Sequence, residues 1–211
     1  MTASDQDLFR VIDDNGRPDP AVDPVLEQGL LRRMFREMLR VRLLDERLVA
    51  LHRQGRIGFY GASTGQEAAP VAAGLALMAH DWVFPALRES ALMLVRGFPL
   101  RTYIAQVYGN QADVLKGRQM PSHMSGRSVN QVSWSTVVGS QLPHAVGAAW
   151  AAKLKGDDTV VMGFLGDGAT SSPDFHCAMN MAGLFSVPVV LVCQNNQLAV
   201  SVPVARQTTD R

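Results

Sequence analysis

Two short apolar runs with a helical segment between them restrict the fold of this chain more than any other feature. Residues 159–165 and 187–193 are continuous and rich in β-branched side chains, as in strands that are buried on both faces. Residues 173–185 have a helical pattern, and Ser172 stands at the position of an N-cap. A strand, a crossover helix and a second strand form a parallel unit. The sequence therefore predicts an α/β fold with a parallel sheet flanked by helices.

Polar clusters follow both predicted strands, at the edge where parallel sheets bind ligands. Gly166, Asp167 and Gly168 come directly after the first strand, and Asn195 and Asn196 come after the second. The glycines let a ligand approach the backbone, and the start of the following helix offers free N–H groups to a phosphate. Asp167 and Asn196 supply the oxygen ligands that magnesium prefers. These features predict a site for a phosphate group and a divalent metal.

The spacing of the two clusters separates this hypothesis from simpler ones. A Gly-Asp-Gly sequence alone most often forms a turn, but here 26 residues (169–194) with a strand-helix-strand pattern lead to the asparagines. A Rossmann dinucleotide site is disfavoured, because no Gly-x-Gly-x-x-Gly follows a first strand and the second strand ends in amides instead of an acid.

The rest of the chain is predicted to be helical around one long polar loop. Residues 1–23 hold Asp, Asn, Gly and Pro in quick succession, which is typical of an extended arm, and residues 24–211 are expected to form one domain. Helices are expected from an N-cap at Asp23 to Gly55, from a Thr64–Glu67 capping box through the Ala-rich run to Gly74, and over residues 86–96, 99–108 and 141–154. The small side chains after Glu67 predict a deeply packed helix.

The polar loop over residues 109–133 is long enough to indicate a function. His123 lies in it, and two interpretations are open: a position near a substrate channel, or a solvated loop histidine. His144 and His176 lie in predicted helices and are interpreted as core or interface histidines.

Charge and cysteine content limit the classes of partner. The chain of 211 residues has 20 Lys and Arg against 19 Asp and Glu, so no strong field favours nucleic acid or an anionic membrane. Cys177 and Cys193 lie in apolar stretches and are expected to be buried thiols in a reducing compartment. The first residues are acidic and no apolar run is long enough to span a membrane, which predicts a soluble, cytoplasmic protein.

The wider sequence resembles the alpha subunits of the thiamine-diphosphate-dependent 2-oxo acid dehydrogenase (decarboxylating) family, most closely the branched-chain branch. The Gly-Asp-Gly and Asn-Asn clusters match the thiamine-diphosphate motif of that family. Further matching stretches are 53–57 (RQGRI), 65–68 (GQEA), 88–89 (RE), 117–121 (GRQMP) and 141–143 (QLP).

The resemblance implies a thiamine-diphosphate-binding fold and a specific set of cofactor ligands. Asp167, Asn196 and the backbone carbonyl of Leu198 match the ligands of Mg²⁺, and Arg88 matches the arginine that neutralises the diphosphate. The full set of implied cofactor-binding residues is Arg88, Ser135, Thr136, Val138, Gly166, Asp167, Gly168, Ala169, Asn196 and Leu198. No residue of this chain is assigned as a catalytic acid or base. Without the resemblance, Arg88 is interpreted as a surface charge.

The activity that the resemblance implies is oxidative decarboxylation of 2-oxo acids, with transfer of the acyl group to lipoyl. Its implied partners are a beta subunit that supplies the activating glutamate, in a heterotetramer, and the lipoyl acyltransferase core. Alpha subunits of this family extend past the asparagines, so the domain is expected to be incomplete at its C-terminus.

An alternative interpretation is a truncated, non-catalytic paralogue that binds partner subunits. It rests on the expected truncation and on departures from the family pattern at positions 87, 172, 173 and 197: Leu87 replaces Tyr, Ser172 and Pro173 replace Glu and Gly, and Gln197 and Leu198 replace Gly and Tyr.

Overall fold

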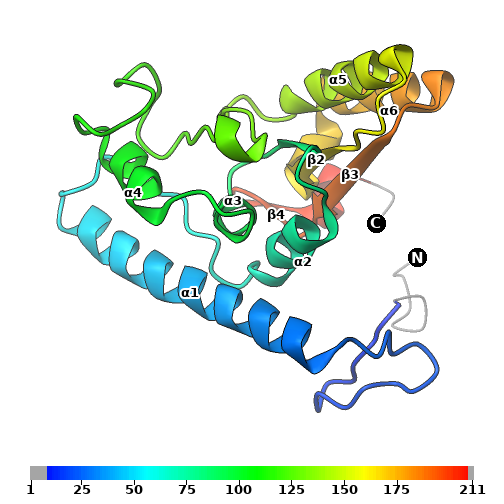
Figure 1. Ribbon diagram of the computed structural model, residues 1–211, viewed down its shortest axis with the longest axis horizontal. Helices are drawn as coiled ribbons and strands as arrows, with labels where there is room; N and C mark the ends of the chain where they lie inside the picture. Colours follow the sequence, from blue (N-terminus) through cyan, green and yellow to red (C-terminus); the bar gives the residue numbers. More distant parts are fainter. Residues whose placement is uncertain (1–8, 209–211) are drawn as a thin grey trace.

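A computed structural model describes residues 9–208 of this protein (Figure 1). Three parallel strands form its main sheet. Strand β2 (Val161–Gly166) lies in the centre, between β1 (Trp82–Phe84) and β3 (Val189–Gln194). β2 and β3 pair in parallel along their whole length, so the predicted strand-helix-strand unit and the α/β class are confirmed. β1 was not predicted, because a strand of three residues is too short to show a periodic pattern.

Helices α5 (Gln141–Lys155) and α6 (Pro173–Phe185) lie side by side next to the sheet (Figure 1). Ala145 of α5 is fully buried in a cluster with apolar residues of β1 and β2. At the other end of the two helices, the rings of Trp150 and Phe185 stack with centroids 4.3 Å apart. α6 crosses from β2 to β3, as the sequence predicted for residues 173–185.

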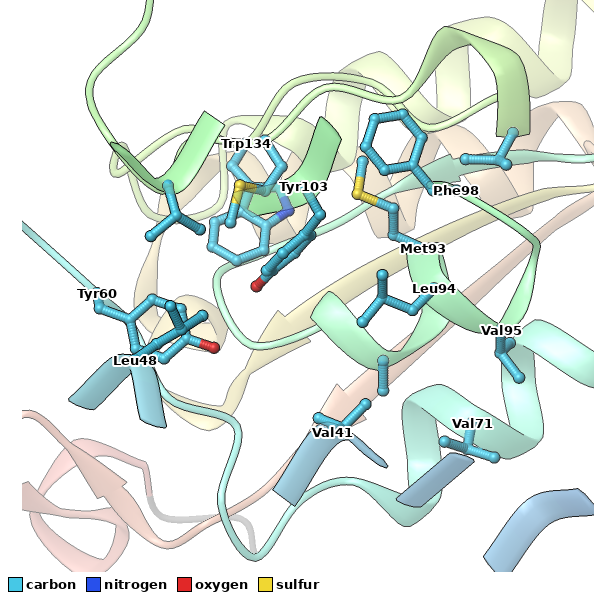
Figure 2. Packing of buried hydrophobic residues seen from close by; sticks show 14 of the residues in the cluster. Val41, Leu48, Tyr60, Val71, Met93, Leu94, Val95, Phe98, Tyr103 and Trp134 are labelled. Atoms are coloured by element: carbon cyan, nitrogen blue, oxygen red, sulfur yellow. The ribbon is translucent and has the colours of Figure 1, made fainter. Parts of the chain in front are cut away.

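Four further helices enclose the largest apolar core, shown in Figure 2. They are α1 (Gln28–Arg53), α2 (Ala68–Ala76), α3 (Ser90–Val95) and α4 (Leu100–Tyr108). A Cβ on Gly74 of α2 would lie only 2.4 Å from Cγ1 of Val95, so a glycine is required for α2 to approach α3 this closely. The predicted deep packing of this helix holds for one face only, because Pro70, Val71 and Gly74 are buried whereas Ala68, Ala69 and Ala72 are exposed.

The remaining elements are short and lie near the ends of the strands. Two 3-10 turns cover Arg127–Val129 (η2) and Asp167–Ser171 (η3). An antiparallel hairpin of β4 (Leu198–Ala199) and β5 (Val202–Pro203) follows β3, and α7 (Val204–Gln207) packs against η3. Residues 109–133 are irregular apart from η2 and isolated bridges, as predicted.

Three predicted helix starts are wrong: α3 begins at Ser90 instead of residue 86, and two others fail because their polar side chains make other contacts. α1 begins at Gln28: the Asp23 carboxylate accepts the N–H of Val25 at 3.0 Å, and Val25 has a φ of 47°, which is incompatible with a continuous helix. The Thr64–Glu67 capping box does not form, since the Thr64 hydroxyl donates to Asp45 at 3.2 Å. By contrast, the N-cap predicted at Ser172 is confirmed.

The prediction that both cysteines are buried is wrong. Cys177 and Cys193 are exposed free thiols. Cys193 lies on β3, none of whose six residues is fully buried, so the apolar run here does not correspond to a strand that is buried on both faces. His144 and His176 are also exposed, which excludes a position in the core.

The predicted arm is described only from residue 9 onwards; residues 1–8 and 209–211 lie outside the described part of the chain. A bridge between Ile12 and Pro18 closes a turn there, and the Asp13 carboxylate accepts the N–H of Arg17 at 2.8 Å. Within residues 9–208, no helix is both long enough and apolar enough to cross a membrane.

Candidate functional site

A cavity of about 590 Å³ lies at the carboxyl ends of β2 and β3. Four separate segments form its walls: the loop after β1, the segment that leads into α5, the turn after β2, and the segment after β3. All ten residues that the sequence analysis selected line this cavity: Arg88, Ser135, Thr136, Val138, Gly166, Asp167, Gly168, Ala169, Asn196 and Leu198. The fold therefore brings together residues that are up to 110 positions apart (88 to 198).

Asp167 is the buried charge of this cavity. It is 4% exposed, and its Oδ2 atom has no hydrogen-bond partner within residues 9–208. Its backbone carbonyl accepts hydrogen bonds from Thr170 Oγ1 and Gln207 Nε2, both at 2.7 Å, so the turn is fixed by contacts that leave the carboxylate available. A buried carboxylate oxygen without a partner is costly, and a cation in the cavity would satisfy it.

The other two predicted metal ligands lie beyond the end of β3. The Asn196 side chain is exposed, and its Oδ1 accepts the N–H of Leu198 at 3.1 Å. An amide oxygen has two lone pairs, so this contact leaves one for a cation. Within residues 9–208 no group of three or more His, Cys, Asp and Glu side chains is placed to hold a metal. A metal here therefore depends on one carboxylate and neutral oxygens, a donor set suited to Mg²⁺ with phosphate and water.

The glycines around the cavity have different structural roles. A Cβ on Gly166 would meet nothing within 4 Å, so this position is open to a ligand. A Cβ on Gly168 would lie 2.9 Å from the Cβ of Ala199, so Gly168 is needed for the approach of β4. Gly139, which the sequence analysis did not select, has a φ of +87°, and a Cβ there would lie 2.4 Å from Ser172 Oγ. Its contact joins the wall before α5 to the start of α6.

Arg88 lies in the loop between β1 and α3, not in a helix. The guanidinium is half-buried, lines the cavity, and donates from Nη1 to the backbone carbonyl of Ala62. The interpretation of Arg88 as a surface charge is therefore wrong. Leu87, which precedes it, also lines the cavity and packs 3.3 Å from the position of a Cβ on Gly61.

Two backbone positions at the cavity rim are strained. Gln197 has a φ of 68° and Val200 a φ of 58°. At Gln197, where the family pattern has Gly, a positive φ costs on the order of 1 kcal/mol relative to Gly, because the Cβ crowds the backbone. Val200 is fully exposed at the turn of the β4–β5 hairpin and lines the cavity.

His123 is buried, at 4% exposed, so its interpretation as a solvated loop histidine is wrong. Nδ1 lies 3.1 Å from the Pro121 carbonyl, and Nε2 has no partner within residues 9–208. It does not line the cavity. Eight further residues line the cavity that were not predicted to bind the cofactor: Ala86, Leu87, Gly139, Gln141, Ser171, Ser172, Ala199 and Val200. Leu87, Gln141 and Ser172 had been noted as matches to the family pattern or departures from it. Most of the others are neighbours in sequence of predicted residues, which is the signal that could have found them.

Glu89 is a second buried carboxyl group beside the cavity, at 2% exposed. It lines a small adjoining pocket of about 90 Å³ together with Arg88, Gln194 and Asn196. Burial raises the pKa of Glu89 to about 7, although N–H groups of the same loop, including that of Arg88 at 3.2 Å, stabilise its charged form. The Arg88-Glu89 pair was noted in the sequence only as a motif.

The raised pKa of Glu89 predicts a pH-dependent stability. The unfolded chain loses this proton near the ordinary value of 4.5, whereas the folded chain keeps it to about 7. The contribution of this proton to the free energy of unfolding is therefore complete below pH 4.5 and is lost as the pH rises through 7. The loss is at most on the order of 3 kcal/mol. We expect the free energy of unfolding, measured by urea denaturation from pH 4.5 to 8, to fall more steeply in the wild type than in Glu89→Gln. Equal slopes would contradict this assignment.

Comparison with known proteins adds independent findings. A model of the dehydrogenase E1 component family matches residues 35–210. The 2-oxoisovalerate dehydrogenase subunit alpha 1 of Arabidopsis thaliana is 39% identical over 94% of this chain and 42% of its own length. The corresponding alpha subunit of Bos taurus is 38% identical over 95% of this chain and 44% of its own length. This chain thus spans less than half the length of these curated relatives.

A structural neighbour is more distant. The structure of an enzyme from Mycobacterium smegmatis, described as thiamin diphosphate-dependent, is 16% identical with a TM-score of 0.39 and covers 65% of this chain and 22% of that chain. A similarity of this size carries no weight for fold or function.

The expected cytoplasmic location is contradicted by the relatives, which are named as mitochondrial proteins. The prediction rested on acidic first residues, on the lack of a long apolar run and on thiols expected in a reducing compartment, and all three are compatible with more than one compartment. These sequence properties therefore had no power to separate a cytoplasmic protein from a mitochondrial one.

Proposed function

The chain belongs to the dehydrogenase E1 component family, and from this premise we propose that it binds the diphosphate of thiamine diphosphate, with Mg²⁺, in the cavity at the ends of β2 and β3. In this proposal it serves as the cofactor-holding part of an alpha subunit that decarboxylates branched-chain 2-oxo acids. The acyl group passes to the lipoyl group of an acyltransferase core, and a beta subunit completes the site in a hetero-oligomer.

One observation carries the proposal: the buried, unpartnered Oδ2 of Asp167 and the guanidinium of Arg88 line the same cavity. Their charges are opposite, yet no ion pair joins them among the described residues. A metal-diphosphate complex satisfies both groups, because the cation meets the carboxylate and the phosphate oxygens meet the arginine. A neutral polar ligand can hydrogen-bond to both groups but compensates neither charge.

Different walls of the cavity are expected to contact different parts of the cofactor. η3 begins at Asp167, and the N–H groups of the first residues of a helical turn have no partner within the turn, so those near Gly168 and Ala169 suit phosphate oxygens. Val138 and Leu198 supply apolar surface to the same cavity, as a bound aromatic ring requires. When bound, thiamine diphosphate supplies the electron sink for loss of carbon dioxide. Position and charge neutralisation are the contributions of this chain.

The proposal predicts that cofactor binding requires the divalent metal. Calorimetric titration of thiamine diphosphate should give a measurable affinity with Mg²⁺ and none with excess EDTA, because the Asp167 carboxylate repels the diphosphate when no cation lies between them. The fold is expected to be the same in both buffers, which circular dichroism checks. Equal affinity with and without the chelator would contradict the proposed site.

A further inference from the structure

Asp45 of α1 is a fully buried carboxylate, at 0% exposed, that does not line the cavity. All its recorded hydrogen bonds come from the segment of residues 60–64. The Tyr60 hydroxyl donates to Oδ1 at 2.5 Å, and the Ser63 N–H donates to Oδ2 at 2.7 Å. The hydroxyls of Ser63 and Thr64 donate to Oδ2 at 3.0 and 3.2 Å. One carboxylate therefore fastens this whole segment to α1.

Segment 60–64 also makes the contact that holds Arg88. The carbonyl of Ala62, directly before Ser63, accepts the hydrogen bond from Arg88 Nη1. A second link connects the same two segments, since the hydroxyl oxygens of Ser63 and Ser90 lie 3.3 Å apart. Asp45 thus fixes Tyr60, two residues before Ala62, and Ser63, directly after it, and the Ala62 carbonyl in turn fixes the guanidinium at the cavity.

A neighbouring ion pair holds the next part of the segment in the same way. Arg42, one helical turn before Asp45, donates to Glu67 Oε1 at 2.5 Å, and Glu67 Oε2 accepts the N–H of Gly65 at 3.0 Å. The Arg42 guanidinium holds the pKa of Glu67 below its usual range. This pair has no recorded contact with Arg88 or with Ala62, so among these carboxylates Asp45 is the one whose partners flank the arginine's acceptor.

We propose that Asp45 is a positioning residue for the cofactor site, which acts through segment 60–64 to hold the Arg88 guanidinium toward the diphosphate. The inference rests on the proposed function, in which Arg88 neutralises the diphosphate. Losing Asp45 leaves Arg88 present but free to adopt other rotamers, so the binding contribution of the arginine falls while the other cofactor contacts persist.

A double-mutant cycle tests the inference, with calorimetric titration of thiamine diphosphate in Mg²⁺ as the readout. Asp45→Asn is nearly isosteric and is expected to raise the Kd roughly tenfold in the presence of Arg88. In the Arg88→Ala background the same substitution is expected to change the Kd by less than about twofold, because the group that it positions is gone. Equal factors in both backgrounds, or no effect in either, would overturn the proposal.

The matched control is Asp113→Asn. Asp113 is a buried carboxylate, at 6% exposed, that also accepts backbone N–H groups, those of Leu115 and Gly117 at 2.9 and 3.0 Å. Asp113 makes no hydrogen bond or ion pair with Arg88 or with segment 60–64 among the described residues, so Asp113→Asn should leave the Kd unchanged. A loss of affinity equal to that of Asp45→Asn would mean that both substitutions act through general destabilisation of the fold. If Asp45→Asn does not fold, Ser63→Ala takes its place and should raise the Kd roughly threefold only with Arg88 present.

The outcomes separate this inference from the function on which it rests. A wild-type chain that binds no thiamine diphosphate with Mg²⁺ overturns both. A wild type that binds, weakened by Arg88→Ala but not by Asp45→Asn or Ser63→Ala, overturns the positioning role alone.

Discussion

Asp167→Asn is expected to reduce the affinity for thiamine diphosphate in Mg²⁺ on the order of a thousandfold, because it removes the only carboxylate of the proposed metal site. The substitution keeps the shape of the side chain. It also removes a buried charge whose Oδ2 has no partner within residues 9–208, so the ligand-free protein should be as stable as the wild type or more stable. Affinity and stability are therefore expected to move in opposite directions.

Calorimetry and urea denaturation of the same preparations measure the two quantities. Asp174→Asn is the matched control, since Asp174 lies in the first turn of α6 and does not line the cavity. It should leave the Kd unchanged. A destabilised Asp167→Asn protein with unchanged affinity would show instead that Asp167 holds the turn after β2 and binds no metal.

The second large effect concerns turnover. With thiamine diphosphate and Mg²⁺ saturating, the chain alone should release no measurable carbon dioxide from 2-oxoisovalerate. Arg88 and Asp167 are the only ionisable residues among those that line the cavity within residues 9–208, and the proposed site uses both to hold the metal-diphosphate complex. Glu89 lines the adjoining pocket and not the cavity itself, so among the described residues no further acid or base lines the cavity to activate the cofactor ring. In the proposed function a beta subunit supplies that group.

Adding a purified beta subunit of a branched-chain 2-oxo acid dehydrogenase tests this expectation, with carbon dioxide release and gel filtration as readouts. Turnover that appears only with both chains supports the half-site interpretation. Association without turnover supports the non-catalytic paralogue. Turnover by a monodisperse single chain would contradict both, and a beta subunit whose ring-activating glutamate is replaced by glutamine serves as the negative control.

Local sequence signals were sufficient for the centre of the fold. The run at 159–165, the cap at Ser172 and the run at 187–193 act over a few residues each, and β2, α6 and β3 formed as predicted. Signals that depend on a competing partner were not sufficient. Asp23 and Thr64 have the residue types of helix caps, but they bind elsewhere because a nearby N–H or carboxylate is available.

Residue type and spacing along the chain were enough to predict the parallel unit and the two polar clusters at its strand ends. The resemblance of the sequence to a known family indicated the family and the ten residues that line the cavity. Only the tertiary structure decided how those residues are held. The contact of Gly139 with Ser172 joins positions 33 apart (139 to 172), and Asp45 reaches Arg88 through a segment that neither residue borders in sequence. Such contacts result from packing between distant elements, and no periodicity or motif along the chain encodes them. The same reason explains the cysteines, whose exposure depends on which neighbours cover β3 and α6.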